Sequence, residues 1–316
     1  MTPRTPTSGE PASAARPEIP TRLLVHALVR EDGTVDAGQL YAVAGTLGMS
    51  DQQVRLCVRR LVEERRFTQD GRGRKALLRA VSDCSGTLAP DADHVRHAYR
   101  QDAGLAPWDG TWHLFAFAIP ESCRSARDVL RDRLLHLGAA PLQGGLYVTA
   151  NPVTDLVEAH ARHLGVLSCV TFLTSTDLRV GTLTDPPALA AALWPLEDVA
   201  AGHERLAAFT RRCLDELGAA RESAAHGSPE GRLTMAVELA AEFTRAMEPD
   251  PFLPPELLPR PWPGAAARRL AAECWQRLRA AGPAGAAEHG DLSLFRLYHD
   301  ALGTGAESDT AIPDQG

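Results

Sequence analysis

The sequence predicts an α+β fold of three domains, and three observations lead to it. An amphipathic helix followed by a basic, glycine-containing turn occupies residues 47–80. Apolar runs typical of buried strands alternate with helical segments between residues 112 and 173, and from residue 187 onward only helical periodicity remains. These patterns predict an N-terminal winged helix-turn-helix, a central ferredoxin-like α/β domain and a C-terminal helical domain.

The predicted recognition helix begins at Asp51, because Ser50 can cap its N-terminus and Gln53 can complete a capping box. Apolar side chains then repeat with helical spacing at Val54, Val58, Leu61 and Val62. Side chains that can bond to phosphates and base edges fall on the remaining surface. We expect base contacts from Gln52, Gln53, Arg55 and Arg59, and a phosphate or minor-groove contact from Arg60.

Two further helices and a hairpin complete this domain. The apolar stripes 23–28 and 40–47 end at Gly33 and Gly48, and Gly48 supplies the turn before the recognition helix. After Phe67, residues 68–80 form a predicted wing whose tip carries three further phosphate candidates, Arg72, Arg74 and Lys75. The alternative reading of the same pattern is a solvated bundle of amphipathic helices.

The charge distribution favours the DNA-binding interpretation. Residues 1–80 hold 13 Arg and Lys against 9 Asp and Glu, a net charge of +4, which leaves −11 for the other residues. The chain as a whole is acidic, with a net charge of −7 and a pI near 5.9. The local field around a module decides its affinity for a polyanion, so only the N-terminal part is suited to contact DNA.

The expected domain limits follow from shifts in composition. Residues 1–19 and 303–316 are expected to be disordered, and residues 83–106 form a polar connector with a short helix near residues 94–100. The remaining expected domains are 20–82 (winged helix), 107–180 (ferredoxin-like) and 181–302 (helical). With no membrane-length apolar stretch and no apolar signal-peptide core, a cytoplasmic location and no membrane partner are expected.

Within the central domain, strands are expected at 112–119, 142–149 and 166–173, with helices at 124–137 and 152–164 between them. In the C-terminal domain, helices are expected at 188–194, 196–217, 233–247 and 265–281. The proline-rich segment 249–264 cannot continue a helix and is expected to be a rigid, partly buried loop.

Four segments resemble the PaaX family of repressors of phenylacetate catabolism. They are VRLCVRRLVEERRF (54–67), the strand-helix-strand from Gly110-Thr-Trp to GGLYVTANP, LWPLED (193–198) and DPFLPPELLPRPWPG (250–264). The resemblance extends over residues 20–302. It implies a winged helix, a central domain like the small CRISPR-associated nucleases, a helical C-terminal domain, a homodimer, and release from double-stranded operator DNA by an aryl-CoA thioester such as phenylacetyl-CoA.

The chain departs from the family where an effector contact would be sought. The family tends to read His-Glu-Tyr-Arg-Arg where this chain has residues 241–245, Ala-Glu-Phe-Thr-Arg, and His203 stands where Tyr is common. The resemblance therefore implies the repressor function more directly than it implies the identity of the ligand. Arg245 keeps its family position, while Arg127 and Arg131 could bind CoA phosphates or only solvate a helix face. These three are the effector-binding candidates.

No constellation of catalytic residues, cofactor motif or metal site is predicted. The pairs His94/His97 and His160/His163 lack a third nearby ligand, and the six cysteines form no C-x-x-C motif. The alternative is an acyl-CoA-binding protein or enzyme, including a CRISPR-associated-type nuclease, whose basic module only localises it. Such nucleases need an acidic residue at the end of the first strand, where this chain has Ile119, Pro120 and Glu121.

Overall fold

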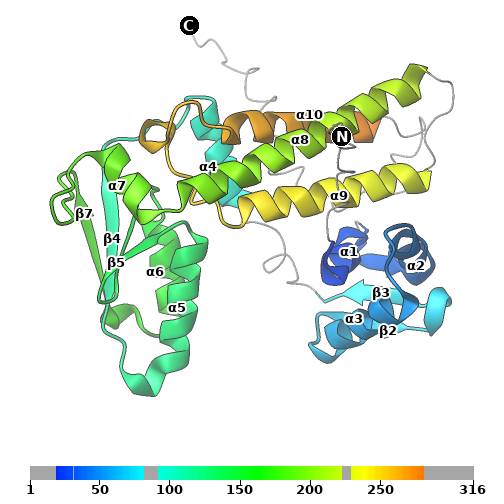
Figure 1. The fold of residues 1–316 in the computed structure, drawn as a ribbon. Helices are drawn as coiled ribbons and strands as arrows, with labels where there is room; N and C mark the ends of the chain where they lie inside the picture. The colour runs from blue at the N-terminus through cyan, green and yellow to red at the C-terminus, as the bar shows by residue number, and fades with distance from the viewer. Residues whose placement is uncertain (1–18, 31, 82–91, 223–228, 281–316) are drawn as a thin grey trace, which may run out of the picture.

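The computed structural model describes residues 19–30, 32–81, 92–222 and 229–280. Apart from residue 19, the terminal segments expected to be disordered lie outside these ranges. Figure 1 shows three parts: an N-terminal unit, a central sheet with helices packed on it, and long C-terminal helices that extend over the other two parts.

The N-terminal unit combines three helices with a small antiparallel sheet whose strand order is β1-β3-β2. Its elements are α1 (Thr21–Ala27), β1 (Thr34–Asp36), α2 (Ala37–Thr46), α3 (Asp51–Glu63), β2 (Phe67–Asp70), the 3-10 turn η1 (Gly73–Lys75) and β3 (Leu77–Ala80). All but β1 follow from the sequence pattern. A three-residue strand is too short to show an alternation, so β1 is found only by its pairing with β3.

Tight C-terminal turns fix how α2 and α3 join their neighbours. After α2, Gly48 has φ 76° and the N–H of Met49 donates to the carbonyl of Ala44 at 2.8 Å. After α3, Arg65 takes the same left-handed position with φ 58°, and the N–H of Arg66 donates to the carbonyl of Leu61 at 2.9 Å. Both are Schellman turns. They end each helix sharply and set α3 between α2 and the hairpin.

The central part has the strand and helix order of a ferredoxin-like domain. Its elements are β4 (Trp112–Phe117), α5 (Arg124–His136), β5 (Ala140–Gln143), β6 (Leu146–Thr149), α6 (Thr154–His163) and β7 (Val170–Ser175). All neighbouring strands are antiparallel, in the order β5-β6-β4-β7. This is the split β-α-β arrangement repeated twice.

The single strand expected over residues 142–149 is wrong. Gly144 and Gly145, with φ values of 50° and 90°, fold this segment into the hairpin between β5 and β6. Two consecutive residues with positive φ make the turn whose twist matches paired strands, and glycine accepts that conformation without a steric cost. The Gly-Gly pair was the available signal for the missing strand.

Both faces of the central sheet are covered. Helices α5 and α6 pack on one face, where Phe115 contacts a cluster that includes Leu130 and Leu134. The other face carries Trp112 in a separate cluster with Leu189 and Leu253, which come from α7 and from the proline-rich segment. The expectation of helices on one face is therefore right for α5 and α6, while a C-terminal segment closes the opposite face.

The C-terminal helices begin and end within a few residues of the expected limits. They are α7 (Pro186–Leu193), α8 (Leu196–Glu222), α9 (Pro229–Met247) and α10 (Gly264–Ala280). Between α9 and α10 the proline-rich segment is irregular apart from the 3-10 turn η5 (Pro255–Leu257), and it buries Phe252, Leu253 and Leu257, as expected of a rigid loop. No helix in the described ranges is both long and apolar enough to span a bilayer.

Residues 92–102, which the sequence pattern placed in a connector, form the packed helix α4 (Ala92–Asp102). Val95 and Ala98 on this helix are 1% and 0% exposed, and they belong to the same apolar core as α8, α9 and α10. The few apolar side chains of this polar segment share one helical face. That is enough to dock a short helix against a larger apolar surface, although it gives a weak signal in the sequence.

Candidate nucleic-acid interface

The capping residues of α3 take the positions that the sequence predicts. The Ser50 hydroxyl accepts a hydrogen bond from the N–H of Gln53 at 3.2 Å, and the Gln53 side chain accepts one from the N–H of Ser50 at 2.8 Å. This capping box satisfies two backbone donors that the helix start would leave without a partner. Gln53 therefore uses its amide oxygen locally, and its amide nitrogen remains as the group that could contact DNA.

The outer face of α3 presents the polar side chains expected for DNA contact. Val54 and Leu61 are buried in the unit, whereas the five candidates on this helix are exposed: Gln52, Gln53, Arg55, Arg59 and Arg60. Arg59 is paired with Glu63 at 3.0 Å, one turn along the same helix. Arg55 and Arg60 have no ion-pair partner among the described residues. These two guanidinium groups are thus available to an external anion.

The basic turn η1 lies beside the N-terminal end of α3. Arg74 pairs with Asp51, the first residue of α3, at 3.3 Å, and its guanidinium lies 5.5 Å from the centre of the Tyr41 ring on α2. Arg72 and Lys75 are exposed and unpaired within the described part of the chain. Arg74 therefore holds the turn against the helices, which leaves its two basic neighbours to extend the cationic surface.

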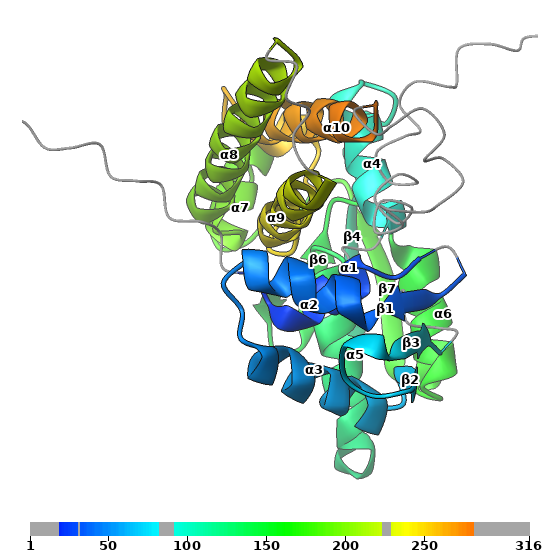
Figure 2. The same ribbon diagram turned by 90° about the vertical axis from the view of Figure 1, so that its right-hand side faces the viewer.

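The N-terminal unit rests on α9 through α1 and α2. Figures 1 and 2 both show α3 and the β2-β3 hairpin on the side of the unit that faces away from α9. The apolar residues of the unit continue into the core of the helical part, as Leu23 and Val43 belong to the same cluster as Leu239. The cationic face is thus presented outward from a unit packed firmly on its body.

One partly buried histidine of this unit lies in surroundings that disfavour its protonation. His26 on α1 lies edge-on to Phe67, with ring centres 5.2 Å apart, and its Nε2 atom is buried without a hydrogen-bond partner. Burial, assisted by the charges of Arg22 and Arg66, lowers the pKa of His26 from 6.5 to about 4. The imidazole is consequently neutral in the folded unit at neutral pH.

We expect the N-terminal unit to lose stability as the pH falls from 6.5 towards 4. In this window His26 of the unfolded chain binds a proton and His26 of the folded unit does not. The stability that the neutral imidazole contributes is therefore complete above pH 6.5 and lost as the pH falls to about 4. Protection factors for amide hydrogen exchange of residues 21–46, which compare the measured rate with the intrinsic rate at the same pH, should fall in this window, and His26→Leu should remove much of the effect. His163→Ala, a change at an exposed histidine of α6, is the control and should leave the profile unchanged.

The three effector candidates lie on two different helices, and each has a local carboxylate partner. On α5, Arg127 pairs with Glu121 at 3.0 Å and Arg131 pairs with Asp132 at 3.0 Å. On α9, Arg245 pairs with Glu242. Nothing in the described contacts joins the two sets. An anionic ligand at any of these arginines would have to compete with the carboxylate already beside it.

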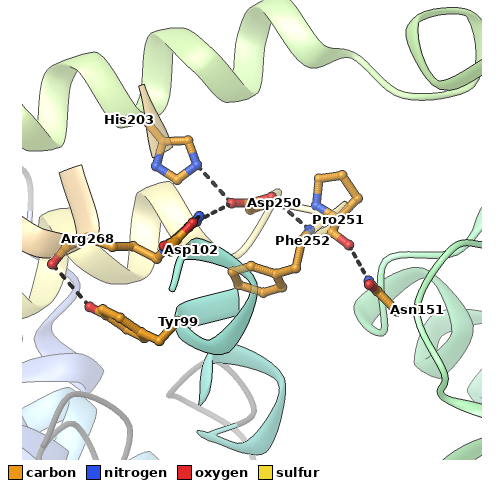
Figure 3. Close-up of polar contacts among 8 residues, drawn as sticks. All are labelled: Tyr99, Asp102, Asn151, His203, Asp250, Pro251, Phe252 and Arg268. Carbon is orange, nitrogen blue, oxygen red and sulfur yellow. Dashed lines mark hydrogen bonds and ion pairs between the residues drawn. The ribbon is translucent and has the colours of Figure 1, made fainter. Parts of the chain in front are cut away.

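A buried polar cluster lies where α4, the C-terminal helices and the proline-rich segment meet, next to the central domain (Figure 3). At its centre, Arg268 of α10 donates to both carboxylate oxygens of Asp102 on α4, at 2.7 and 2.8 Å, and to Asp250 at 3.2 Å. His203 of α8 lies 2.8 Å from the same Asp250 oxygen, and the N–H of Phe252 donates to the other one at 2.8 Å. This cluster fixes α4, α8, α10 and the proline-rich segment to one another.

The electrostatics of this cluster keep Asp250 charged. Burial alone would raise the pKa of its carboxyl, but the hydrogen bond with His203 and the charge of Arg268 outweigh it, so the pKa lies below its usual range. Arg268 is 5% exposed and faces Asp102 as well as Asp250. A buried arginine between two carboxylates is a complete ion-paired group, which explains how such charges are tolerated in the core.

The central domain joins the same junction through hydrogen bonds. Asn151, which follows β6 and is fully buried, donates to the carbonyl of Pro251 at 2.9 Å and accepts from Gln101 of α4 at 3.2 Å. Trp194 donates from its indole N–H to the carbonyl of Gly138 at 3.0 Å. Three of the segments that carry the family resemblance, GGLYVTANP, LWPLED and DPFLPP, therefore meet here.

Sequence reasoning did not identify the polar residues of this junction. One signal was available, because Arg268 falls among the apolar positions of α10, next to Ala267, one turn before Ala271 and two turns before Trp275. Its partners could not be inferred, since Asp102 and Arg268 are 166 residues apart. Within the described residues, no group of three or more His, Cys, Asp or Glu side chains could hold a metal ion.

Comparisons with known proteins agree with this architecture. Two family models match consecutive stretches, the PaaX protein central Cas2-like domain over residues 105–189 and the PaaX-like protein C-terminal domain over residues 194–287. The transcriptional repressor PaaX of Escherichia coli (strain K12) is 26% identical over 274 residues, which cover 85% of this chain and 82% of that protein.

Among solved structures, the uncharacterized protein Rv0674 from Mycobacterium tuberculosis is 23% identical in sequence. The match covers 78% of this chain and 90% of that one, with a TM-score of 0.41. Taken together, the two matching family models span more than half of the sequence. The chain belongs to the PaaX family.

Proposed function

We propose that this protein is a transcriptional repressor whose N-terminal unit is a winged helix-turn-helix that binds operator DNA. One observation carries the proposal: an exposed cationic surface, made by α3 and the turn η1, faces away from an acidic body. The order of helices and strands in the unit fits a winged helix, with α3 as the recognition helix and β2-β3 as the wing. The similarity to a transcriptional repressor supports the same reading.

In the proposed complex, α3 enters the major groove and η1 approaches the adjacent backbone. Arg55 and Gln52 would contact base edges, and Arg59 would exchange its partner Glu63 for a base or phosphate. Arg60, Arg72 and Lys75 would contact phosphates, whereas Arg74 would act mainly by holding the wing against Asp51. We propose a homodimer acting in the cytoplasm, which would read two half-sites about one helical turn apart or a multiple of it.

The salt dependence of DNA binding tests this proposal. Replacing Arg60, Arg72 and Lys75 together with Ala should reduce the magnitude of the slope of log K against log salt by up to about 3 per protomer, because each lost phosphate contact removes close to one unit. If Arg55 reads a guanine, Arg55→Ala alone should also cost about 1 to 3 kcal/mol and relax specificity at one base pair. Fluorescence anisotropy on an operator selected from random duplexes gives both quantities.

The control for this experiment is Arg277→Ala, which removes an exposed, paired arginine from α10. It should leave the slope unchanged. A triple variant that folds normally and keeps the parental slope would mean that this surface does not contact DNA.

We further propose that an aryl-CoA or related acyl-CoA thioester releases the repressor from DNA. This rests on the family and on the arginines of α5 and α9. A ligand shifts the equilibrium only by its differential affinity for the two states, so a hundredfold preference for the DNA-free state would weaken operator binding by about a hundredfold. The protein-DNA complex should be titrated with phenylacetyl-CoA, other acyl-CoA thioesters and the free acids.

Arg127→Ala and Arg131→Ala should raise the thioester concentration needed for release and leave operator affinity without ligand intact. Arg162→Ala on α6, another exposed arginine with a local carboxylate partner, is the matched control. Should no thioester dissociate the complex or bind by calorimetry, the effector belongs to another class, and the altered segment 241–245 is where its contacts would first be sought.

A further inference from the structure

The exposed face of α3 has an apolar residue at its centre. Leu56 is 45% exposed, and within residues 51–63 it is the large hydrophobic side chain that the fold leaves at the surface. Gln52 and Gln53 lie one turn before it, and Arg59 and Arg60 lie one turn after it. Because residues three and four positions apart are neighbours on a helix, all four polar side chains surround Leu56.

This position is not explained by packing inside the unit. Val54 and Leu61 supply the core contacts of α3, with exposed fractions of 0% and 1%. Leu56 instead borders a surface hollow of about 360 Å³ between α1 and α3, whose lining also includes Pro20, Cys57 and Arg60. The hollow leaves the leucine side chain free on one flank. A single exposed leucine is ordinary, but one ringed by hydrogen-bond donors calls for a partner with both polar and apolar groups.

The major groove of DNA offers such a partner. Each base pair presents hydrogen-bond donors and acceptors there, and thymine alone adds an apolar group, its 5-methyl. Glutamine and arginine side chains suit the polar edges and the phosphates, whereas a leucine suits the methyl group. The cationic surroundings also match the charge of DNA, which a second copy of this face would not.

We propose that Leu56 reads the 5-methyl group of a thymine in each operator half-site. The inference rests on the proposed DNA-binding function and adds a specificity-determining residue to it. Burying one methyl group contributes a factor of about three to five in affinity, so the contact would discriminate among bases without supplying most of the binding energy.

The test removes the methyl group from the DNA and the side chain from the protein. In an operator selected with the full-length protein, each thymine is replaced in turn by deoxyuridine, which lacks only the 5-methyl group. The unaltered protein should bind roughly three- to fivefold more weakly at one position per half-site. Leu56→Ala should bind the thymine operator more weakly and show no further loss with uracil at that position.

Two variants serve as controls. Arg55→Ala should bind DNA more weakly overall and keep the sensitivity to uracil. Leu56→Met should retain most of the sensitivity to uracil, because a methionine still offers an apolar contact. Thermal melting checks that each variant is folded, which is expected for an exposed position.

Different results would overturn the thymine contact and the DNA-binding function. Operator binding in which the unaltered protein and Leu56→Ala respond equally to every uracil substitution overturns the thymine contact and leaves the repressor function standing. A change in oligomeric state on Leu56→Ala, with unchanged discrimination, would also overturn it, since the residue would then contact a second copy. Failure of the full-length protein to enrich any duplex would remove the DNA-binding function itself.

Discussion

Arg268→Ala should lower the free energy of unfolding by about 3 to 5 kcal/mol, the cost of breaking a buried ion pair from one side. The guanidinium makes three hydrogen bonds to Asp102 and Asp250, and its removal leaves two carboxylates without their cation. Asp250 is 5% exposed, so water cannot replace the lost charge without opening the junction. Chemical denaturation followed by far-ultraviolet circular dichroism measures the loss.

The matched control is Arg277→Ala on the same helix. Arg277 pairs with Glu273 at 2.6 Å, but both side chains are more than a third exposed. An exposed pair contributes at most about 1 kcal/mol, so the free energy of unfolding of this variant should be close to that of the parent protein. Equal, small losses for the two variants would mean that the junction contributes little to stability.

Gly138→Ala should cost about 2 to 5 kcal/mol, from left-handed backbone strain and overpacking together. Gly138 ends α5 with φ 79°, and a Cβ atom placed there would lie 2.4 Å from the carbonyl oxygen of Pro251. That oxygen also accepts the hydrogen bond from Asn151. The methyl group therefore cannot be accommodated without moving the proline-rich segment away from the central domain.

Gly165→Ala separates the two contributions. Gly165 ends α6 in the same kind of turn, with φ 70°, but a Cβ atom there meets nothing within 4 Å. Its substitution should cost only the backbone strain, about 1 to 2 kcal/mol. The difference in unfolding free energy between the two variants measures the close approach of α5 to Pro251. If that difference is near zero, the two segments separate without a cost.

Much of the secondary structure was within reach of the sequence, because its signals are local. The capping box at Ser50 and Gln53 fixes the start of α3, and the long apolar stripes fix α8, α9 and α10 to within a few residues. Where the signal was short, prediction failed. The three residues of β1 are too few to show a pattern, and the apolar run of residues 142–149 conceals the turn at Gly144 and Gly145 that divides it into two strands.

The polar candidates on α3 and its turn could also be proposed from spacing alone, since the helical period decides which residues share a face. The residues that pair with them could not be predicted in this way. The pairing of Arg74 with Asp51 and the position of Tyr41 beneath it depend on how the hairpin folds back onto α2 and α3. The same holds for Arg127, Arg131 and Arg245, whose role in ligand binding stays a prediction.

By itself, the sequence determined the order of the three parts, the helical periods and the outward basic face of α3, because each of these depends on residues within a turn or two of one another. Only the tertiary structure decided that α4 is a packed helix and that Asp102, Asn151, Asp250 and Arg268 form one junction. These residues are brought together over as many as 166 positions of chain. Buried polar groups need partners wherever the fold supplies them, and no local pattern encodes which distant residue that will be.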